Sequence, residues 1–389
     1  MRFMVDRKQM QAACRNLARL VPETSPIEDL TGILMEADEN GGGIRMMATN
    51  LEITLEYRRE AVVAEGGRMV LNGNLMAGMM PLLSGERVSF DTLPGANVVR
   101  IACGNTRYDL SYLSGKHFPE PPAIPMESTA KISGLASLAK RTAFAARQKA
   151  GASADMLTNA KLEVYPAEAH MVCTDGARLA IARQKQENSG RLSLLIPAKS
   201  LALLAGVCGD DAVEAGTNGK TLVFTGDGFV FTTRTMQGEY PDTNALLSKI
   251  KPVYDALVNA QTFREGAESL DTVAEPGALA RVTFADEGIK LHCQSKIGSF
   301  STVTDAIVYN ATPAEGFHYN AADLHHTLRN MVGNLQIGID RTGNMLLKGQ
   351  DLCYLLTPRR PRKVEVVSKQ EKKSKTKKAA KVSKTDKAA

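Results

Sequence analysis

Cysteine is scarce in this chain, and its six residues are scattered singly, none with the spacing of a metal-binding pair. Zinc sites need paired cysteines a few residues apart, and secreted disulfide frameworks are denser than this. We therefore expect reduced thiols packed as small hydrophobic side chains, and neither a metal nor any other cofactor. The six are Cys14, Cys103, Cys173, Cys208, Cys293 and Cys353.

Long hydrophobic runs are also missing. No apolar run approaches the roughly 20 residues that a membrane-spanning helix needs. The segment Met1 to Asp6 is short and charged, which does not fit a secretory signal. These absences exclude the membrane and secreted classes, and we expect a cytoplasmic protein.

Motifs of catalysis are absent as well, since the sequence contains no P-loop, nucleophile elbow or paired-carboxylate constellation. The strongest alternative is a cluster of His318, His325 and His326 near Asp323. Adjacent histidines point to different sides of a helix, so His325 and His326 are poorly placed to share one ion. We therefore expect a protein that is not an enzyme.

The charge of the chain is unevenly distributed. Its net charge is +6, yet residues 359–389 hold thirteen Lys and Arg against three acidic residues. The remainder, residues 1–358, carries 35 basic and 39 acidic residues, a net of −4, with enough apolar residues to bury a core throughout. An acidic body with a basic tail does not indicate a protein coated all over for nucleic acid.

One sequence pattern, which we call a phrase, occurs three times along the chain. Residues 171–181 read as a short apolar strand, an Asp-Gly turn and a second strand, which predicts a hairpin. Similar phrases begin at Arg45 and at Lys290. A second phrase, a strand running into a helix, recurs around Asn72, Pro197 and Asn320, at offsets of 125 and 123 residues.

An aromatic-proline step closes two of the copies, at Phe118-Pro119 and at Tyr240-Pro241. Because proline cannot donate to a strand ladder, each step marks a strand end and a linker. The chain therefore reads as three tandem α+β domains. We expect them at 1–126, 127–250 and 251–362, followed by a disordered Lys-rich tail at 363–389.

The predicted helices carry basic outer faces in the first two domains. A helix that Asp6 caps and that runs to about Leu20 has Lys8, Arg15 and Arg19 on its polar side. A helix that Ser133 caps and that runs to about Lys149 exposes four more cations. Such faces are most often simply solvated, but their recurrence on an acidic body makes them candidate phosphate-facing surfaces.

The repeat phrases, Thr174-Asp175-Gly176-Ala177-Arg178-Leu179-Ala180, Tyr240-Pro241-Asp242 and the ending Tyr354-Leu355-Leu356-Thr357-Pro358, resemble the bacterial replicative sliding clamp, the β subunit of DNA polymerase III. The resemblance covers about 360 residues and rests on the order and spacing of the phrases. It implies a head-to-tail homodimer that closes a ring, with helices lining the hole and antiparallel sheets outside.

That family's function implies the partners. As a clamp the protein would encircle duplex DNA without reading its sequence and act as a processivity factor in DNA replication, in the cytoplasm at the nucleoid. It would bind the DNA polymerase III α subunit, an ATP-driven clamp loader and other proteins that carry a clamp-binding motif. The alternative is a non-ring DNA-binding or interaction protein that reuses the fold.

The resemblance also assigns site residues. The peptide groove between the second and third domains would comprise Leu157, Thr174, Gly176, Arg178, Leu179, Pro241, Leu246, Leu355 and Pro358. The DNA-facing set would be Lys8, Arg15, Arg19, Lys140, Arg141, Arg147, Lys149 and Lys199. The dimer interface would join Tyr108 and Leu110 to Leu270 and Val273, for which ordinary core packing is the alternative.

The Lys-rich tail has two interpretations. It is either a solvated extension, or a tether that touches DNA or acidic partners without specificity and loses its effect as the salt concentration rises.

Overall fold

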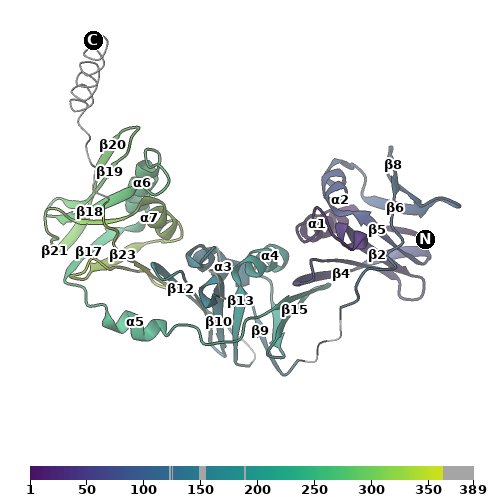
Figure 1. Cartoon of the computed structure of the whole chain (residues 1–389), viewed down its shortest axis with the longest axis horizontal. Helices are drawn as coiled ribbons and strands as arrows, with labels where there is room; N and C mark the ends of the chain where they lie inside the picture. The colour runs from purple at the N-terminus through teal and green to yellow at the C-terminus, as the bar shows by residue number, and fades with distance from the viewer. Residues whose placement is uncertain (122–123, 125, 149–154, 188–189, 362–389) are drawn as a thin grey trace, which may run out of the picture.

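The chain forms an open arc of three units, each with helices and sheets (Figure 1). Figure 1 places two helices of each unit toward the inside of the arc, whereas α5 (Thr243–Lys249) lies on the outer side. The computed structural model describes residues 1–121, 124, 126–148, 155–187 and 190–361. The predicted tail and Lys149 lie outside these residues.

Each unit contains the element order β-α-β-β-β twice. The recurrence of this doubled order in three units is the structural basis of the threefold repeat in the sequence. The first unit consists of β1 (Arg2–Asp6), α1 (Arg7–Ala18), β2 (Gly32–Asp38), β3 (Gly43–Thr49), β4 (Ile53–Glu65), β5 (Gly67–Asn72), α2 (Gly73–Met79), β6 (Arg87–Thr92), β7 (Val98–Cys103) and β8 (Thr106–Ser111).

The second unit repeats this order and is followed by a linker helix, α5. It consists of β9 (Ser128–Ile132), α3 (Leu135–Thr142), β10 (Asn159–Tyr165), β11 (Glu168–Thr174), β12 (Arg178–Lys185), β13 (Leu192–Pro197), α4 (Ala198–Cys208), β14 (Val213–Thr217), β15 (Thr221–Gly226) and β16 (Phe229–Arg234), with α5 at Thr243–Lys249.

The third unit adds one strand, β21, to the same order. It consists of β17 (Tyr254–Asn259), α6 (Ala260–Asp271), β18 (Leu279–Ala285), β19 (Gly288–Gln294), β20 (Ser299–Thr304), β21 (Ala306–Asn310), β22 (Phe317–Asn320), α7 (Ala321–Leu328), β23 (Asn334–Ile339), β24 (Met345–Lys348) and β25 (Leu352–Leu356).

The three predicted hairpins are confirmed. β3 pairs with β4, β11 with β12 and β19 with β20, all antiparallel. The three strand-to-helix phrases are confirmed too, as β5 into α2, β13 into α4 and β22 into α7. Period-2 patterning and turn chemistry act locally, so the sequence alone could reveal these elements.

Main-chain hydrogen bonds join neighbouring units. β4 pairs with β16 between the first and second units, within a twelve-stranded sheet. β12 pairs with β25 between the second and third, within a nine-stranded sheet. A separate four-stranded sheet, β20-β19-β18-β22, completes the third unit. Each junction is therefore a continuous strand ladder rather than a loose contact between domains.

The prediction for α1 is confirmed, since the Asp6 carboxylate accepts a hydrogen bond from the Gln9 amide at 2.8 Å and the face with Met10, Cys14 and Leu17 is buried. Every cysteine among the described residues is a free thiol. Burial raises the pKa of Cys14 and Cys173 to about 12, as expected of thiols packed as hydrophobic side chains.

The predicted second-unit helix was wrong at both ends. Ser133 donates its hydroxyl to Gln186 and does not cap α3. The cap comes instead from Asp210, whose carboxylate accepts from the Ser137 amide at 2.8 Å and from its hydroxyl at 2.6 Å. The helix ends at Thr142, whose hydroxyl donates back to the Leu138 carbonyl. Sequence proximity thus suggested a cap that a residue 73 positions away provides.

Candidate functional site

A cluster of apolar side chains lies on the outer sheet face where the second and third units meet. Leu179 on β12 is directly opposite Leu355 on β25, and Leu355 is in turn opposite Leu346 on β24. Val172 and Ile181 complete this outer-face cluster, as we name it. The strand pairing therefore brings two of the predicted groove residues, 176 positions apart in the sequence, into contact.

The turn between β11 and β12 forms the end wall of this cluster. The Asp175 carboxylate accepts hydrogen bonds from the amides of Ala177 and Arg178, both at 2.9 Å. The Thr174 hydroxyl accepts from the Gly176 amide at 3.1 Å and donates to the Arg178 carbonyl at 2.7 Å. Gly176 has a φ of +91°, a conformation that favours glycine. The turn is thus held rigidly by its own side chains.

Arg178 links the two units. Its guanidinium pairs with Asp175 at 3.0 Å and with Asp323 at the start of α7, and it lies 5.9 Å from the centre of the Phe144 ring. Its side chain is only 14% exposed. Asn320 caps α7 by accepting from the Asp323 amide, which fixes the carboxylate. Much of the binding capacity of Arg178 is therefore used within the chain, at the junction.

The segment that follows the second unit covers the cluster. The Tyr240 hydroxyl accepts from the Thr174 amide at 3.1 Å and donates to the Asn159 carbonyl at 3.3 Å, and burial raises the pKa of this phenol. Leu247 and Ile250, in and just after α5, pack against the cluster. Its floor is consequently buried, with Leu179 3% and Leu355 5% exposed.

The remaining predicted groove residues lie around this floor. Leu157 is half-buried, and its side chain is near the Gly176 turn. Leu246 is 44% exposed and Pro241 is exposed, while Pro358 is half-buried. The Thr357 amide, just before Pro358, donates to the Ala177 carbonyl at 2.9 Å and so brings the end of β25 to the turn. The structure thus gathers seven of the nine at the junction, while Pro241 and Leu246 are exposed on the segment that covers the cluster.

Sequence reasoning missed several residues of this site. Tyr240 had been noted as part of an aromatic-proline step, but its contact with β11 was not predicted. Phe144, Asp323 and the α5 residues Leu247 and Ile250 had no local signal, because their roles depend on contacts between distant segments.

Arg147, a member of the predicted DNA-facing set, lies beside the turn of the groove. Its guanidinium pairs with Asp155 and donates to the Asp175 carbonyl at 2.8 Å. The helix that was to present it ends at Thr142, so Arg147 follows α3 and supports the turn of the groove, while its side chain remains 40% exposed.

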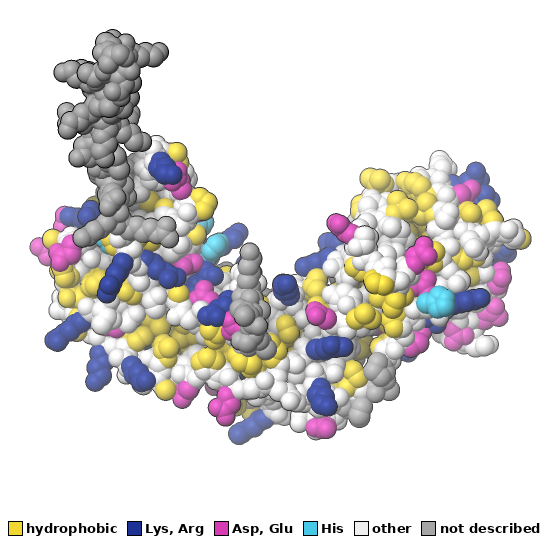
Figure 2. Space-filling model, viewed as in Figure 1, with side chains coloured by type: hydrophobic (Ala, Val, Ile, Leu, Met, Phe, Trp, Pro, Cys, Tyr) yellow, Lys and Arg dark blue, Asp and Glu magenta, His cyan; other side chains and the backbone are white. Residues whose placement is uncertain are grey.

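The other described members of the DNA-facing set are on helices of the concave side or at their ends. Lys8 and Arg15 of α1, Lys140 of α3 and Lys199 of α4 are exposed. Figure 2 shows Lys and Arg side chains at intervals along the concave edge. Arg141 is half-buried and donates to the Ser137 carbonyl and to Gln184, so it is less available than its neighbours.

Arg19 is exposed just after α1 and also contacts the second unit. A Cβ at Gly206, in α4, would lie 2.6 Å from its guanidinium. The glycine therefore leaves room for a cation that reaches across the first junction.

The third helix pair differs in charge. His325 of α7 contacts Asp271 of α6 at 3.0 Å, and Arg264 lies 3.9 Å from Glu268. Within the described ranges, no group of three or more His, Cys, Asp or Glu side chains is arranged to hold a metal ion. In the same residues, no helix has both the length and the apolarity of a membrane span.

The two sets predicted for the dimer interface differ in exposure. Tyr108 and Leu110 are half-buried on β8, the edge strand of the first sheet. Leu270 is fully buried in the core of its own unit, whereas Val273 is half-buried just after α6. The side chain of Leu270 cannot reach a second copy, so we correct that assignment to core packing.

Known protein families match the chain domain by domain. Residues 1–122 match the family model described as DNA polymerase III beta subunit, N-terminal domain, and residues 130–242 match the central domain. The beta sliding clamp of Streptomyces coelicolor is 27% identical over 301 residues, which cover 74% of this chain and 77% of that protein. That of Bacillus subtilis is 21% identical over 330 residues, covering 81% and 86%.

Solved structures resemble the whole described arc. A putative DNA polymerase III beta subunit from Eubacterium rectale has a TM-score of 0.81 at 17% identity and covers 93% of this chain and 100% of its own. The beta subunit from Thermotoga maritima has a TM-score of 0.80 at 17% identity, with the same coverage. These structures show that the fold is shared.

Proposed function

Since this chain belongs to the DNA polymerase III beta subunit family and is a DNA sliding clamp, we propose that two copies close head to tail into a ring around duplex DNA. The ring would act as a processivity factor by holding replication proteins on the DNA. The arc of Figure 1, with helices inside and sheet edges at its ends, supports this proposal.

The observation that carries the proposal is the distribution of charge. Exposed Lys8, Arg15, Lys140 and Lys199 stand on concave helices, while residues 1–358 carry a net charge of −4. Cations on the concave side attract phosphates without reading bases, and the net negative charge of residues 1–358 weakens nonspecific binding elsewhere. DNA would therefore be retained in the hole and remain free to slide.

Ring closure needs complementary ends. β8 is an edge strand at one end of the arc, and β20 is an edge strand of the four-stranded sheet at the other. Unpaired edge strands readily pair with another chain, so we propose that β8 of one copy lies beside β20 of the next, with Tyr108 and Leu110 facing the end of α6 at Val273.

The groove is the proposed site for partner peptides. Leu157, Leu179, Leu246 and Leu355 offer an apolar slot, and the rigid Gly176 turn offers fixed backbone groups. Because Leu247 and Ile250 cover the floor, a hydrophobic peptide would have to displace or extend the α5 segment. The polymerase α subunit, the clamp loader and other clamp-binding proteins are the proposed partners.

We further propose domain boundaries at 1–126, 127–250 and 251–362, each enclosing one β-α-β-β-β pair. The protein would have no catalytic activity and need no cofactor, and it would work in the cytoplasm at the nucleoid. Loading onto DNA would depend on a separate ATP-driven loader.

The decisive experiment compares retention of the loaded protein on nicked circular DNA and on the same DNA after linearisation. We expect retention on the circle and loss from free ends, because a closed ring is linked topologically to DNA. Equal, salt-sensitive binding to both would show simple adhesion by the basic surfaces and would favour the non-ring alternative. Deleting residues 363–389 tests the tether interpretation of the tail, which predicts weaker retention at low salt.

A further inference from the structure

Within the described residues, the first two units have their outer sheet face occupied by an aromatic segment of their own chain. In the first unit Phe118 is 4% exposed and inserts among Leu34, Met47 and Val70, which are neighbours on β2, β3 and β5. In the second unit Tyr240 occupies the corresponding place beside Val172. Both aromatics precede a proline and then an acidic residue. We call each such segment a strap.

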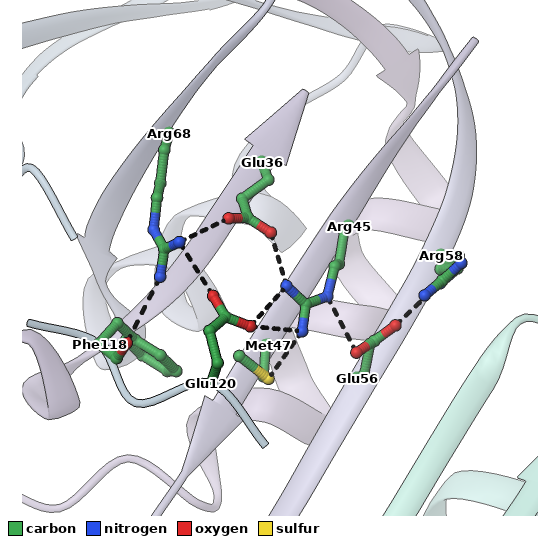
Figure 3. A network of polar contacts seen from close by, with 8 residues as sticks. All are labelled: Glu36, Arg45, Met47, Glu56, Arg58, Arg68, Phe118 and Glu120. Atoms are coloured by element: carbon green, nitrogen blue, oxygen red, sulfur yellow. Dashed lines mark hydrogen bonds and ion pairs between the residues drawn. The ribbon is translucent and has the colours of Figure 1, made fainter. Parts of the chain in front are cut away.

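The acidic residue of the first strap is held by cations of the sheet (Figure 3). Glu120 pairs with Arg45 at 3.1 Å and with Arg68 at 2.9 Å. Glu36 bridges the same two arginines, at 2.7 Å to Arg45 and 3.0 Å to Arg68, so the four side chains form a closed ring of ion pairs. The outer face of this unit therefore recognises an extended segment by its carboxylate as well as its ring.

The corresponding face of the third unit carries different side chains. Strand register places Arg281 directly between His292 on β19 and His318 on β22, as Leu34 lies between Met47 and Val70 in the first unit. Three apolar positions are thus replaced by an arginine and two histidines. Lys290 occupies the position of Arg45, since it is opposite Thr283 as Arg45 is opposite Glu36.

Three of these four side chains have no side-chain partner in the part of the chain that the structure describes. Among the described residues, Arg281, His292 and His318 form neither an ion pair nor a side-chain hydrogen bond, although all three are half-buried. Burial and the neighbouring charges of Arg281 and His292 lower the pKa of His318. Arg281, Lys290 and His292 line a depression of about 470 Å³. An anion in this depression would relieve the repulsion among them.

We propose that the outer face of the third unit is a docking site for an acidic, extended segment of a partner protein, whose carboxylates Arg281, His292 and His318 would hold as Arg45 and Arg68 hold Glu120. This surface is distinct from the groove at the junction. The occupant of the matching face in each other unit is a segment of polypeptide, and in the first unit cations of the sheet bind its carboxylate, which favours a peptide over a nucleic acid.

The acidic side chains at the edge of the depression also favour a peptide over a nucleic acid. Asp286 and Glu287 line the depression too, and Glu287 pairs with Lys290. A continuous polyanion such as a phosphate backbone would meet these carboxylates, whereas separate side-chain carboxylates can be spaced to avoid them. In Figure 1, β18 lies toward the outside of the arc, with α6 and α7 on the inner side of this unit.

The test uses the full chain and a fluorescein-labelled peptide of alternating aspartate and alanine, with hydrogen exchange measured by mass spectrometry. We expect the peptide to protect β18, β19 and β22. In anisotropy titrations the triple variant Arg281→Gln, His292→Gln and His318→Gln should bind about tenfold more weakly, since it removes the charge-assisted contact of Arg281 together with both imidazoles. Lys348→Gln, on exposed β24 surface of the same unit, is the matched control and should bind like the wild type.

Three results would overturn the proposal. One is protection that excludes β18, β19 and β22, for example binding only through the basic tail. Another is an affinity of the triple variant equal to that of the wild type. The third is a single-stranded oligonucleotide of equal charge that protects these strands more strongly than the peptide does. The exchange measurement on the wild type decides the matter even if the triple variant does not fold.

Discussion

Replacing Arg178 with methionine should loosen the junction between the second and third units. The guanidinium contacts two carboxylates, Asp175 and Asp323, and the three side chains are 14%, 21% and 22% exposed. Methionine keeps the packing of the aliphatic stem near Phe144 but leaves both carboxylates without their cation. The junction ladder of β12 and β25 begins at this residue, opposite Leu356.

The expected loss of stability in Arg178→Met lies between two known limits. Exposed ion pairs contribute up to about 1 kcal/mol, and removing one partner of a fully buried pair costs about 3–5 kcal/mol. For these mostly shielded groups we expect about 2 kcal/mol, felt at the junction. Since 1.4 kcal/mol is a factor of ten, amides of β12 and β25 should exchange roughly 30-fold faster.

Hydrogen exchange provides an internal reference, because the other junction has the same construction. Amides of β4 and β16 should be unaffected in Arg178→Met. Arg183→Met, an exposed cation on the same strand, is the matched control and should leave both junctions unchanged. The double variant with Asp323→Asn should cost less than the sum of the two single changes, because both remove the same ion pair.

Two outcomes would refute this reasoning. If Arg178→Met accelerated exchange equally at both junctions, the effect would be a global loss of stability. If it accelerated exchange at neither, the ion pair would be unimportant and strand pairing alone would hold the junction.

Further predictions concern single positions. Gly176→Ala should lower the free energy of unfolding by about 1–2 kcal/mol, because alanine is strained at a φ of +91°. Leu51, at the matching turn of the first unit, has a φ of +72°, so Leu51→Asn should raise that free energy by about 0.5 kcal/mol; thermal unfolding checks both signs. Lys199→Glu should weaken retention on circular DNA and reduce the salt dependence of DNA binding by about one counterion, whereas unchanged retention would remove Lys199 from the proposed interface. Burial raises the pKa of the Glu120 carboxyl, but its ion pairs with two arginines lower this pKa by more, so that it lies below 4.5 in the folded protein. The ion pairs of Glu120 therefore stabilise the fold above pH 4.5, and this stabilisation is lost as the pH falls through the lower pKa of the folded state. The difference in unfolding midpoint between the wild type and Glu120→Gln should therefore be present at neutral pH and vanish in acid, and a difference that persisted unchanged in acid would contradict the assignment.

The elements of the site could be predicted from the sequence, but several of its contacts could not. The Asp175-Gly176 turn is local chemistry, and the structure places it where the pattern indicated. The start of α3 was misjudged, because its cap is Asp210, on a segment far along the chain. The predicted helix position of Arg147 was wrong too, since α3 ends at Thr142 and the chain then turns toward the groove.

Burial was the other quantity that the pattern left open. Leu270 and Tyr108 both read as apolar positions, and only packing shows that the first is enclosed while the second lies half-buried on an edge strand. Strand and helix periods reveal which face is apolar. They do not reveal whether the chain itself or another molecule covers that face.

By itself the sequence determined the threefold repeat, the hairpins, the strand-to-helix steps and the acidic body, because each depends on composition or on residues a few positions apart. Only the tertiary structure decided that β12 pairs with β25, that Arg178 meets Asp323, and that Phe118 and Tyr240 occupy outer faces left to Arg281 and its neighbours in the third unit. The physical reason is that an unpaired edge or an exposed face has many geometrically acceptable partners, and the choice among them is made by the packing of the whole chain.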